Sequence, residues 1–133
     1  MKILGPLQYS NWQYGVVLLL PTCWYIVKLS KVASFKYSVH SQEPFLFSNP
    51  VEKLKEENLH PFLDLHESVI FNYEDAEKVE LKHSWWNKNK LYFTAKGKQY
   101  NFGILERGKS HLYEEWLSET FQDKFSVEGT YTM

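Results

Sequence analysis

The apolar run YGVVLLLPTCWYIVKL, residues 14–29, constrains the fold more than any other part of the chain. It has 16 residues, whereas a membrane-spanning helix needs about 20 consecutive apolar residues. Pro21-Thr22 divides the run, and proline cannot continue a central strand of a sheet. The run also begins too late, after too little positive charge, to resemble a signal peptide. Its β-branched and aromatic residues therefore predict two strands joined by a turn at Pro21-Thr22.

Further strands are predicted in three other parts of the chain. In the segment 32–40, aromatic and β-branched residues alternate with polar ones, which is the period of a half-buried strand. The segment 68–73, SVIFNY, has strand composition as well. Residues 77–105 predict a three-stranded meander, with one turn at 87–90 and a second around Gly97.

Two helices are predicted. The first spans about 50–58, because Pro50 suits the first position of a helix and Pro61 lies where the helix should already have ended. The second spans about 110–121, with Ser110 as its N-cap. Its apolar spacing is that of an amphipathic helix. The spacing is formed by Leu112, Tyr113, Trp116, Leu117, Thr120 and Phe121, and it predicts that Leu112 and Trp116 face the core.

This order of elements predicts a mainly β fold of the α+β type. No alternation of strand, helix and strand occurs, so a doubly wound parallel sheet is not expected. An antiparallel barrel or roll, with the helix at 50–58 inserted and the helix at 110–121 capping one end, would bury the apolar faces. A chain of 133 residues without a linker predicts a single domain over 1–133, with a frayed tail at 129–133.

Several stretches resemble the pleckstrin-homology and GRAM superfold, in particular its bacterial PH-like members. They are GVVLLLPTCWYIVKL, VIFNYEDAEKVELK, NKLYFTAKGKQYNFGI and the Trp-containing YEEWL of the last helix. The resemblance implies a non-catalytic scaffold, which elsewhere binds phosphoinositides, other lipids, peptides or proteins. Lipid-binding members carry a basic motif in the first strand pair, where this chain has LPTC and no base before Lys28. The resemblance therefore does not imply phosphoinositide recognition.

Charge is distributed unevenly along the chain, although the net charge is only −1. Residues 1–42 contain four lysines and no acid, whereas 43–80 contain ten acids and three lysines. Residues 81–105 contain five lysines and no acid, and 106–133 contain six acids and three bases. The near-neutral total argues against a general nucleic-acid binder, which usually has a strongly basic domain.

The stretch Lys82–Ile104 combines its five lysines with six aromatic residues. We hypothesise that its hairpins form a partner-binding rim, made by Trp85, Trp86, Lys88, Lys90, Lys96 and Lys98. Tryptophan and lysine together suit a protein interface or an anionic membrane surface. Stacking on single-stranded nucleic acid, or binding of a small molecule, is a further but less favoured alternative. A purely structural interpretation is also open, in which the lysines prevent edge-to-edge pairing and both tryptophans are packed.

No catalytic signature is present. His60 and His66, with Asp64 and Glu67, form the only local group of metal-ligand residue types. Pro61 and the six-residue separation of the histidines do not fit a zinc motif, so surface histidines in a loop are expected. Cys23 is the only cysteine and lies in an apolar run, which predicts a buried, inert thiol and a reducing compartment.

These observations predict a non-catalytic binding or scaffold module, cytoplasmic, without cofactor or metal. Its partner is expected to be another protein or a second copy of the chain, bound through the basic aromatic hairpins. Peripheral binding to anionic membrane lipid is the alternative. A small metal-dependent enzyme that uses His60 and His66 is the second alternative.

Overall fold

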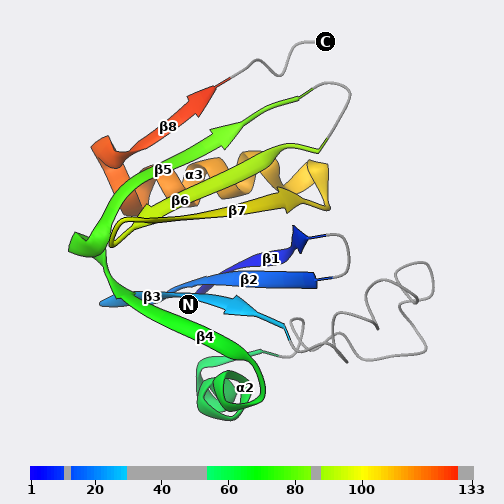
Figure 1. Cartoon of the computed structure of the whole chain (residues 1–133), viewed down its shortest axis with the longest axis vertical. Helices are drawn as coiled ribbons and strands as arrows, with labels where there is room; N and C mark the ends of the chain where they lie inside the picture. The colour runs from blue at the N-terminus through cyan, green and yellow to red at the C-terminus, as the bar shows by residue number, and fades with distance from the viewer. Residues whose placement is uncertain (11–12, 30–53, 85–87, 129–133) are drawn as a thin grey trace. The chain divides into compact units, whose positions relative to one another are not determined.

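A computed structural model describes residues 1–10, 13–29, 54–84 and 88–128 (Figure 1). The chain divides into two compact units, Met1–Ile70 and Phe71–Met133. Strands predominate over helices in the described residues, so the predicted mainly β class is confirmed. The single domain over 1–133 stays a prediction. The predicted strand at 32–40 and the predicted tail at 129–133 lie outside the described residues.

Four strands belong mainly to the first unit, in the order β4-β3-β2-β1. They are β1 (Lys2–Ser10), β2 (Gln13–Leu19), β3 (Cys23–Lys28) and β4 (Glu67–Asn72). β2 pairs antiparallel with both β1 and β3. The two strands predicted around Pro21-Thr22 and the strand predicted at 68–73 are therefore confirmed. β1 was not predicted, because Gly5 and Pro6 interrupt its alternation.

Gly5 marks an irregularity in β1. The pairing register with β2 shifts between Leu4 and Leu7, and Gly5 has a φ of +150°. A Cβ atom at this position would lie 2.6 Å from Cγ1 of Val16. Glycine is needed here because the backbone of β1 approaches the side chain of Val16 too closely for any other residue.

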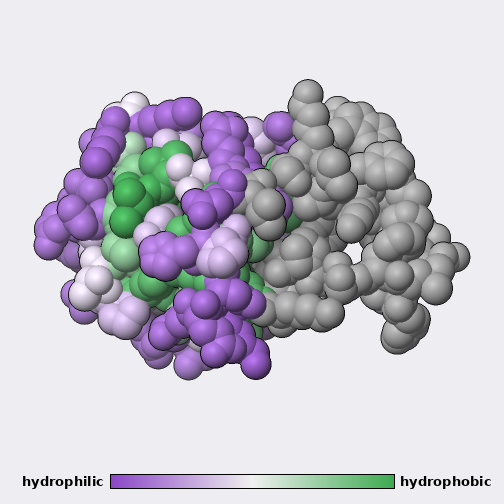
Figure 2. Space-filling model, turned by 90° about the horizontal axis from the view of Figure 1, so that it is seen from below, coloured by the Kyte–Doolittle hydropathy of each residue, from purple (hydrophilic) through white to green (hydrophobic). Residues whose placement is uncertain are grey.

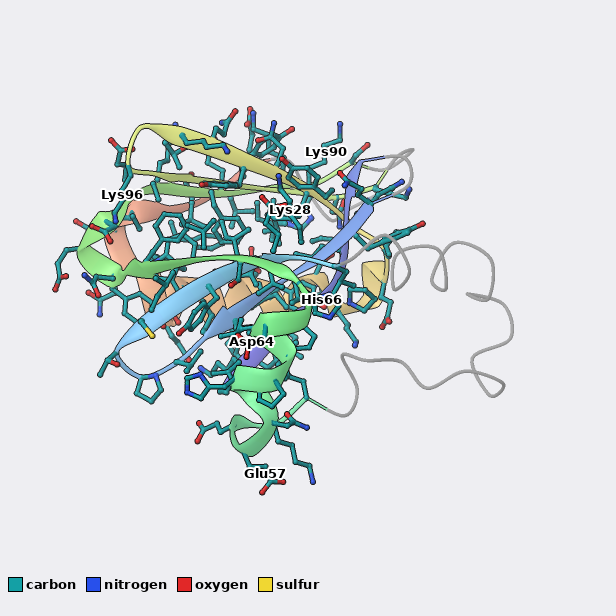
Figure 3. All side chains as sticks on the ribbon, turned by 60° about the horizontal axis from the view of Figure 1, so that its bottom comes forward. Lys28, Glu57, Asp64, His66, Lys90 and Lys96 are labelled. Atoms are coloured by element: carbon teal, nitrogen blue, oxygen red, sulfur yellow. The ribbon has the colours of Figure 1, made fainter. Side chains whose placement is uncertain are left out.

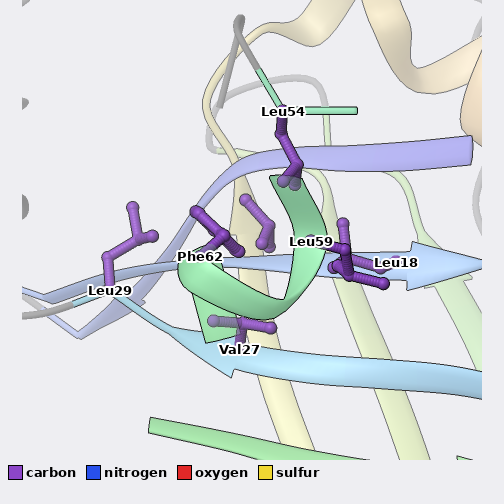
Figure 4. Packing of buried hydrophobic residues seen from close by; sticks show 7 residues of the cluster. Leu18, Val27, Leu29, Leu54, Leu59 and Phe62 are labelled. Carbon is purple, nitrogen blue, oxygen red and sulfur yellow. The ribbon is translucent and has the colours of Figure 1, made fainter. Parts of the chain in front are cut away.

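Both faces of the β1–β3 region are buried, which explains the continuous apolar run in the sequence. On one face, Leu54, Leu59 and Phe62 pack in a cluster with residues of β2 and β3 (Figure 4). The strand residues and the neighbouring loop residue of that cluster are Val16, Leu18, Val27 and Leu29. The alternate residues Val17, Leu19, Trp24 and Ile26 are between 0% and 4% exposed.

The helix predicted at about 50–58 is misplaced in the described residues. A 3₁₀ turn at Glu56–Asn58 leads into α2, Leu59–Leu65, and residues 50–53 lie outside the described part of the chain. Pro61, which was expected to follow the end of the helix, is the third residue of α2. The first four N–H groups of a helix have no partner within it, so a proline in the first turn costs no hydrogen bond.

The second unit contains the predicted meander, which is confirmed. Its strands are β5 (Ala76–Lys82), β6 (Lys90–Ala95) and β7 (Lys98–Ile104), each antiparallel to the next. Lys96 and Gly97 join β6 to β7 with φ values of 51° and 76°. Positive φ at both central residues is the signature of a tight two-residue hairpin turn, so the turn expected around Gly97 is confirmed.

A further strand was not predicted. β8, Phe125–Glu128, pairs parallel with β5, which gives the second unit the strand order β7-β6-β5-β8. β5, β6 and β7 alternate in direction, so β7 runs parallel to β5. The helix after β7 brings the chain back to the end of the sheet where β5 and β7 begin, and β8 begins at that same end. The predicted antiparallel barrel or roll is therefore corrected for the described residues. Neither unit closes its strands into a barrel, and the pair β5–β8 is parallel.

The helix predicted at about 110–121 is confirmed as α3, Ser110–Phe121. Its buried residues are Ser110, Tyr113, Leu117 and Phe121. Leu112 is 39% exposed and Trp116 is half-buried, so the expectation that these two face the core is wrong. The buried positions form a stripe at spacings of three and four residues, which turns Leu112 toward solvent. The rings of Phe121 and Phe93 lie 6.4 Å apart, which anchors the stripe on β6.

Candidate partner-binding hairpin

The four lysines of the predicted rim lie at the two ends of the hairpin formed by β6 and β7. Lys90 begins β6, and Lys96 follows its last residue, so the strand separates them by about 20 Å at roughly 3.3 Å per residue. Figure 3 shows Lys90 and Lys96 at opposite ends of the hairpin. Lys98 lies with Lys96, and Lys88 precedes Lys90 and is exposed. Trp85 and Trp86 lie outside the described residues, so their expected role stays a prediction.

At the turn end, acidic residues compensate the lysines. Lys96 Nζ lies 3.7 Å from Asp75 Oδ2, and the Gly97 N–H donates a hydrogen bond of 3.0 Å to Glu77 Oε2. Both carboxylates come from the acidic block that precedes the basic stretch in sequence. The turn end, made by Lys96, Gly97 and Lys98, is therefore less basic than the local sequence suggests.

Each of these two lysines also lies near an aromatic ring. Lys98 Nζ lies 5.1 Å from the centre of the Tyr100 ring, and Lys96 Nζ lies 6.0 Å from that of Phe71. Phe71 and Tyr100 meet edge to face at 5.9 Å. Contacts of this kind stabilise a lysine by about 0.5–1 kcal/mol at an exposed site. Contacts within the fold therefore account for the presence of both lysines and both rings at the turn end.

The opposite end of the hairpin differs. Lys82 on β5 and Lys90 on β6 are direct cross-strand partners, and Lys90 in turn faces Gly103 on β7. We call Lys82, Lys88 and Lys90 the basic end. Like charges in direct opposition destabilise a sheet. Lys82 Nζ lies 3.4 Å from Glu128 Oε2 and 5.0 Å from the centre of the Tyr92 ring, whereas no described carboxylate forms an ion pair with Lys90.

The solvent face of the meander continues from the basic end in regular rows. The next row contains Glu80, Tyr92 and Asn101. The row after it contains Lys78, Thr94 and Gln99. The opposite face buries the alternate residues Val79, Leu81, Leu91, Phe93, Tyr100 and Phe102. A half-buried tyrosine therefore lies beside two lysines on an otherwise polar face.

A buried asparagine directly precedes Lys90 and forms hydrogen bonds with three other segments. Asn89 is 4% exposed, and its Oδ1 accepts a hydrogen bond of 2.9 Å from the Ser84 N–H. Its Nδ2 donates to Ser110 Oγ at 2.9 Å, and its backbone carbonyl accepts from the Ile104 N–H at 2.8 Å. The sequence indicated only a turn here. Ser110, expected as the N-cap of the last helix, is instead the first residue of α3 and binds Asn89.

The histidines expected in a loop lie on α2 and at its end. His60 is exposed, and His66 follows the helix with its ring centre 4.7 Å from that of Phe62 (Figure 3). Burial lowers the pKa of His66. Across the described residues, no three or more His, Cys, Asp or Glu side chains gather as a metal site. Asp64 and Glu67 are exposed.

Cys23 is half-buried at the start of β3 rather than fully buried. It lies beside Tyr25, whose pKa is raised by burial and additionally by the charge and hydrogen bond of Cys23. As the first residue of β3, Cys23 directly follows the exposed turn Pro21-Thr22.

Exposed apolar residues occur on β4. In β4, Val69 is 39% and Ile70 53% exposed. Figure 2 shows hydrophobic surface surrounded by hydrophilic side chains on the face that it draws. Of the helices that the structure describes, none is long and apolar enough to cross a membrane.

Comparison with known proteins identifies no relative. No protein-family model matches the chain, no curated protein matches it, and no solved structure matches it. The resemblance to PH-like domains therefore stays a hypothesis.

Proposed function

We propose that the protein is a cytoplasmic, non-catalytic binding or scaffold module. It engages an acidic segment of another protein, or of a second copy of the chain, through the basic end and the adjoining face of the meander. The observation that carries this proposal is the direct opposition of Lys82 and Lys90 on neighbouring strands.

The opposition supports binding because two lysines at directly opposed positions repel each other. Two like charges at directly opposed positions destabilise a sheet, whereas an opposite-charge pair would stabilise it by about 0.2–1 kcal/mol. Glu128 offers Lys82 one carboxylate, but that side chain is 70% exposed and the pair is a weak surface contact. Carboxylates from a partner would neutralise both lysines, and Tyr92 beside them provides an aromatic contact of the kind that interfaces favour.

We further propose that the fold is a PH-like domain. An antiparallel meander followed by a helix that packs its buried stripe on β6 supports this assignment. The parallel strand β8 departs from it. The fold by itself gives no partner, which is why the basic end and not the fold carries the function.

The proposal is tested by photo-crosslinking in the native host. A benzophenone amino acid is placed at Asn101, in the row of Tyr92, and as a control at Lys55, which is exposed in the first unit. We expect cross-linked protein peptides rich in Asp and Glu from position 101 only. Their yield should fall when salt is raised, because exposed charges are screened beyond about 8–10 Å.

A charge reversal completes the test. Lys90→Glu should abolish cross-linking from position 101, while Lys78→Glu at the other end of the same face should leave most of it. Equal yields from positions 101 and 55, or no effect of Lys90→Glu, would contradict the proposal. Flotation of the purified protein with phosphatidylserine vesicles, lost in Lys90→Glu and without protein cross-links, would support the membrane alternative instead.

A further inference from the structure

β8 is held to β5 by little more than its backbone. The strand has four residues, paired in parallel register from Val79 with Phe125 to Lys82 with Glu128. Phe125 is half-buried, Val127 is 40% exposed, and the other two side chains are exposed. The Glu128 carboxylate reaches Lys82 at 3.4 Å, but at such exposure an ion pair contributes little.

The connection that returns the chain from α3 to β8 is short and strained. Phe121 is 4% exposed at the end of α3, and only the 3₁₀ turn Gln122–Lys124 separates it from Phe125. Gln122 has φ 52° and ψ −119°. This combination is favourable for glycine and disfavoured for a residue with a side chain. The strain therefore sits at the one residue where the chain reverses.

We infer that β8 exchanges between two copies of the chain, so that β8 of each copy pairs with β5 of the other. β5 can pair with β8 of a second copy in the same register, because that strand has the same sequence as its own β8. The hinge is the connection Gln122–Lys124, and it is open in the exchanged dimer. The strain at Gln122 is then released in each of the two chains. A short hinge under strain favours such exchange. The exchange goes beyond the proposed function, since it uses the edge of β5 and not the face of the meander.

Two cysteine variants, both in a Cys23→Ser background, test whether β8 pairs with β5 of another chain. One chain carries Glu80→Cys and the other Ser126→Cys, at positions paired in register between β5 and β8. Neighbouring strands are close enough for a disulfide. The two chains are mixed, refolded together at high concentration and oxidised. We expect a covalent dimer of one chain of each kind. Its absence, while a single chain with both cysteines closes its own disulfide, would overturn the inference.

The hinge provides an independent test that needs no disulfide. Gln122→Gly removes the strain from the closed monomer, whereas Gln122→Ala removes the side chain but keeps the strain. Relief of a strained backbone of this kind changes an equilibrium by about tenfold. Because a dimer contains two hinges, we expect Gln122→Gly to raise the dimer Kd by about a hundredfold, and Gln122→Ala to leave it near that of the wild type.

The measurement is the molar mass by light scattering after size-exclusion chromatography, over a dilution series. The wild-type dimer should convert to monomer slowly, since β8 must detach first. Three results would each overturn the inference: a wild type that stays monomeric at its highest soluble concentration, equal dimer fractions in Gln122→Gly and Gln122→Ala, or a dimer that dissociates at once on dilution.

Discussion

Asn89 connects three segments of the second unit through one side chain and one carbonyl. The Ser84 N–H, the Ser110 hydroxyl and the Ile104 N–H all find their partner in it. Removal of one partner leaves buried polar groups unsatisfied, which costs more than the bond itself gained. Ser84, the start of α3 and the end of β7 are therefore tied to the start of β6 by one polar residue.

We expect Asn89→Ala to lower the free energy of unfolding by about 1–3 kcal/mol, because the Ser84 N–H and the Ser110 hydroxyl lose their partner. Urea unfolding followed by circular dichroism measures this. Asn101→Ala is the matched control, since Asn101 is exposed on β7, and it should change stability by no more than about 0.5 kcal/mol. Equal effects of the two substitutions would show that the buried hydrogen bonds do not stabilise the loop.

The hairpin between β6 and β7 depends on the backbone conformation of its turn. Gly97 has φ +76° and no atom within 4 Å of the place where a Cβ would lie. Gly108 also has open space around that place. A comparison of the two glycines therefore separates the conformational penalty from steric clash.

Gly97→Ala should destabilise the protein by about 1–2 kcal/mol, because an alanine disfavours positive φ. Gly108→Ala should be neutral or slightly stabilising, since it restricts only the unfolded chain. Thermal unfolding of the two variants side by side measures the difference. If Gly97→Ala were as stable as Gly108→Ala, the turn would not have the conformation described.

α3 offers a second matched pair, Leu117 and Leu112. Leu117 is 0% exposed and Leu112 is 39% exposed. Leu117→Ala should cost about 2–5 kcal/mol, which includes the cavity left in the core. Leu112→Ala should cost clearly less, about 1 kcal/mol or under. Unfolding in guanidinium chloride measures the free energy of unfolding of both variants. A larger loss of stability for Leu112→Ala than for Leu117→Ala would mean that α3 packs by its other face.

At the scale of the molecule, periodicity predicted the strands with clear alternation or continuous apolar runs. It did not decide which side of α3 is buried, because Leu112 and Trp116 are as apolar as Leu117 and Phe121. That choice is made by packing against Phe93, which the helix sequence does not contain. The carboxylates of Asp75 and Glu77 at the hairpin turn come from about 20 residues earlier in the chain, so a local window showed only the lysines. β8 has four residues, too few for a period.

The single domain predicted for the whole chain has a direct test. If 1–133 unfolds as one cooperative unit, the slowest-exchanging amides of β2 and β6 should share one opening free energy and one dependence on urea. Native-state hydrogen exchange with mass spectrometry measures both strands in the same experiment. Distinct opening free energies with distinct urea dependences would show that the units Met1–Ile70 and Phe71–Met133 unfold separately.

Gly5 sets a limit on how β1 can change during evolution. Two independent obstacles meet at this position, a φ of +150° and the methyl group of Val16 at 2.6 Å. A replacement of Val16 by a smaller residue would remove the clash but would leave the backbone conformation unfavourable. No single second-site suppressor can therefore rescue a side chain at position 5. In a saturation library this position should tolerate only glycine, and the route to another residue requires at least two simultaneous changes that rebuild the strand.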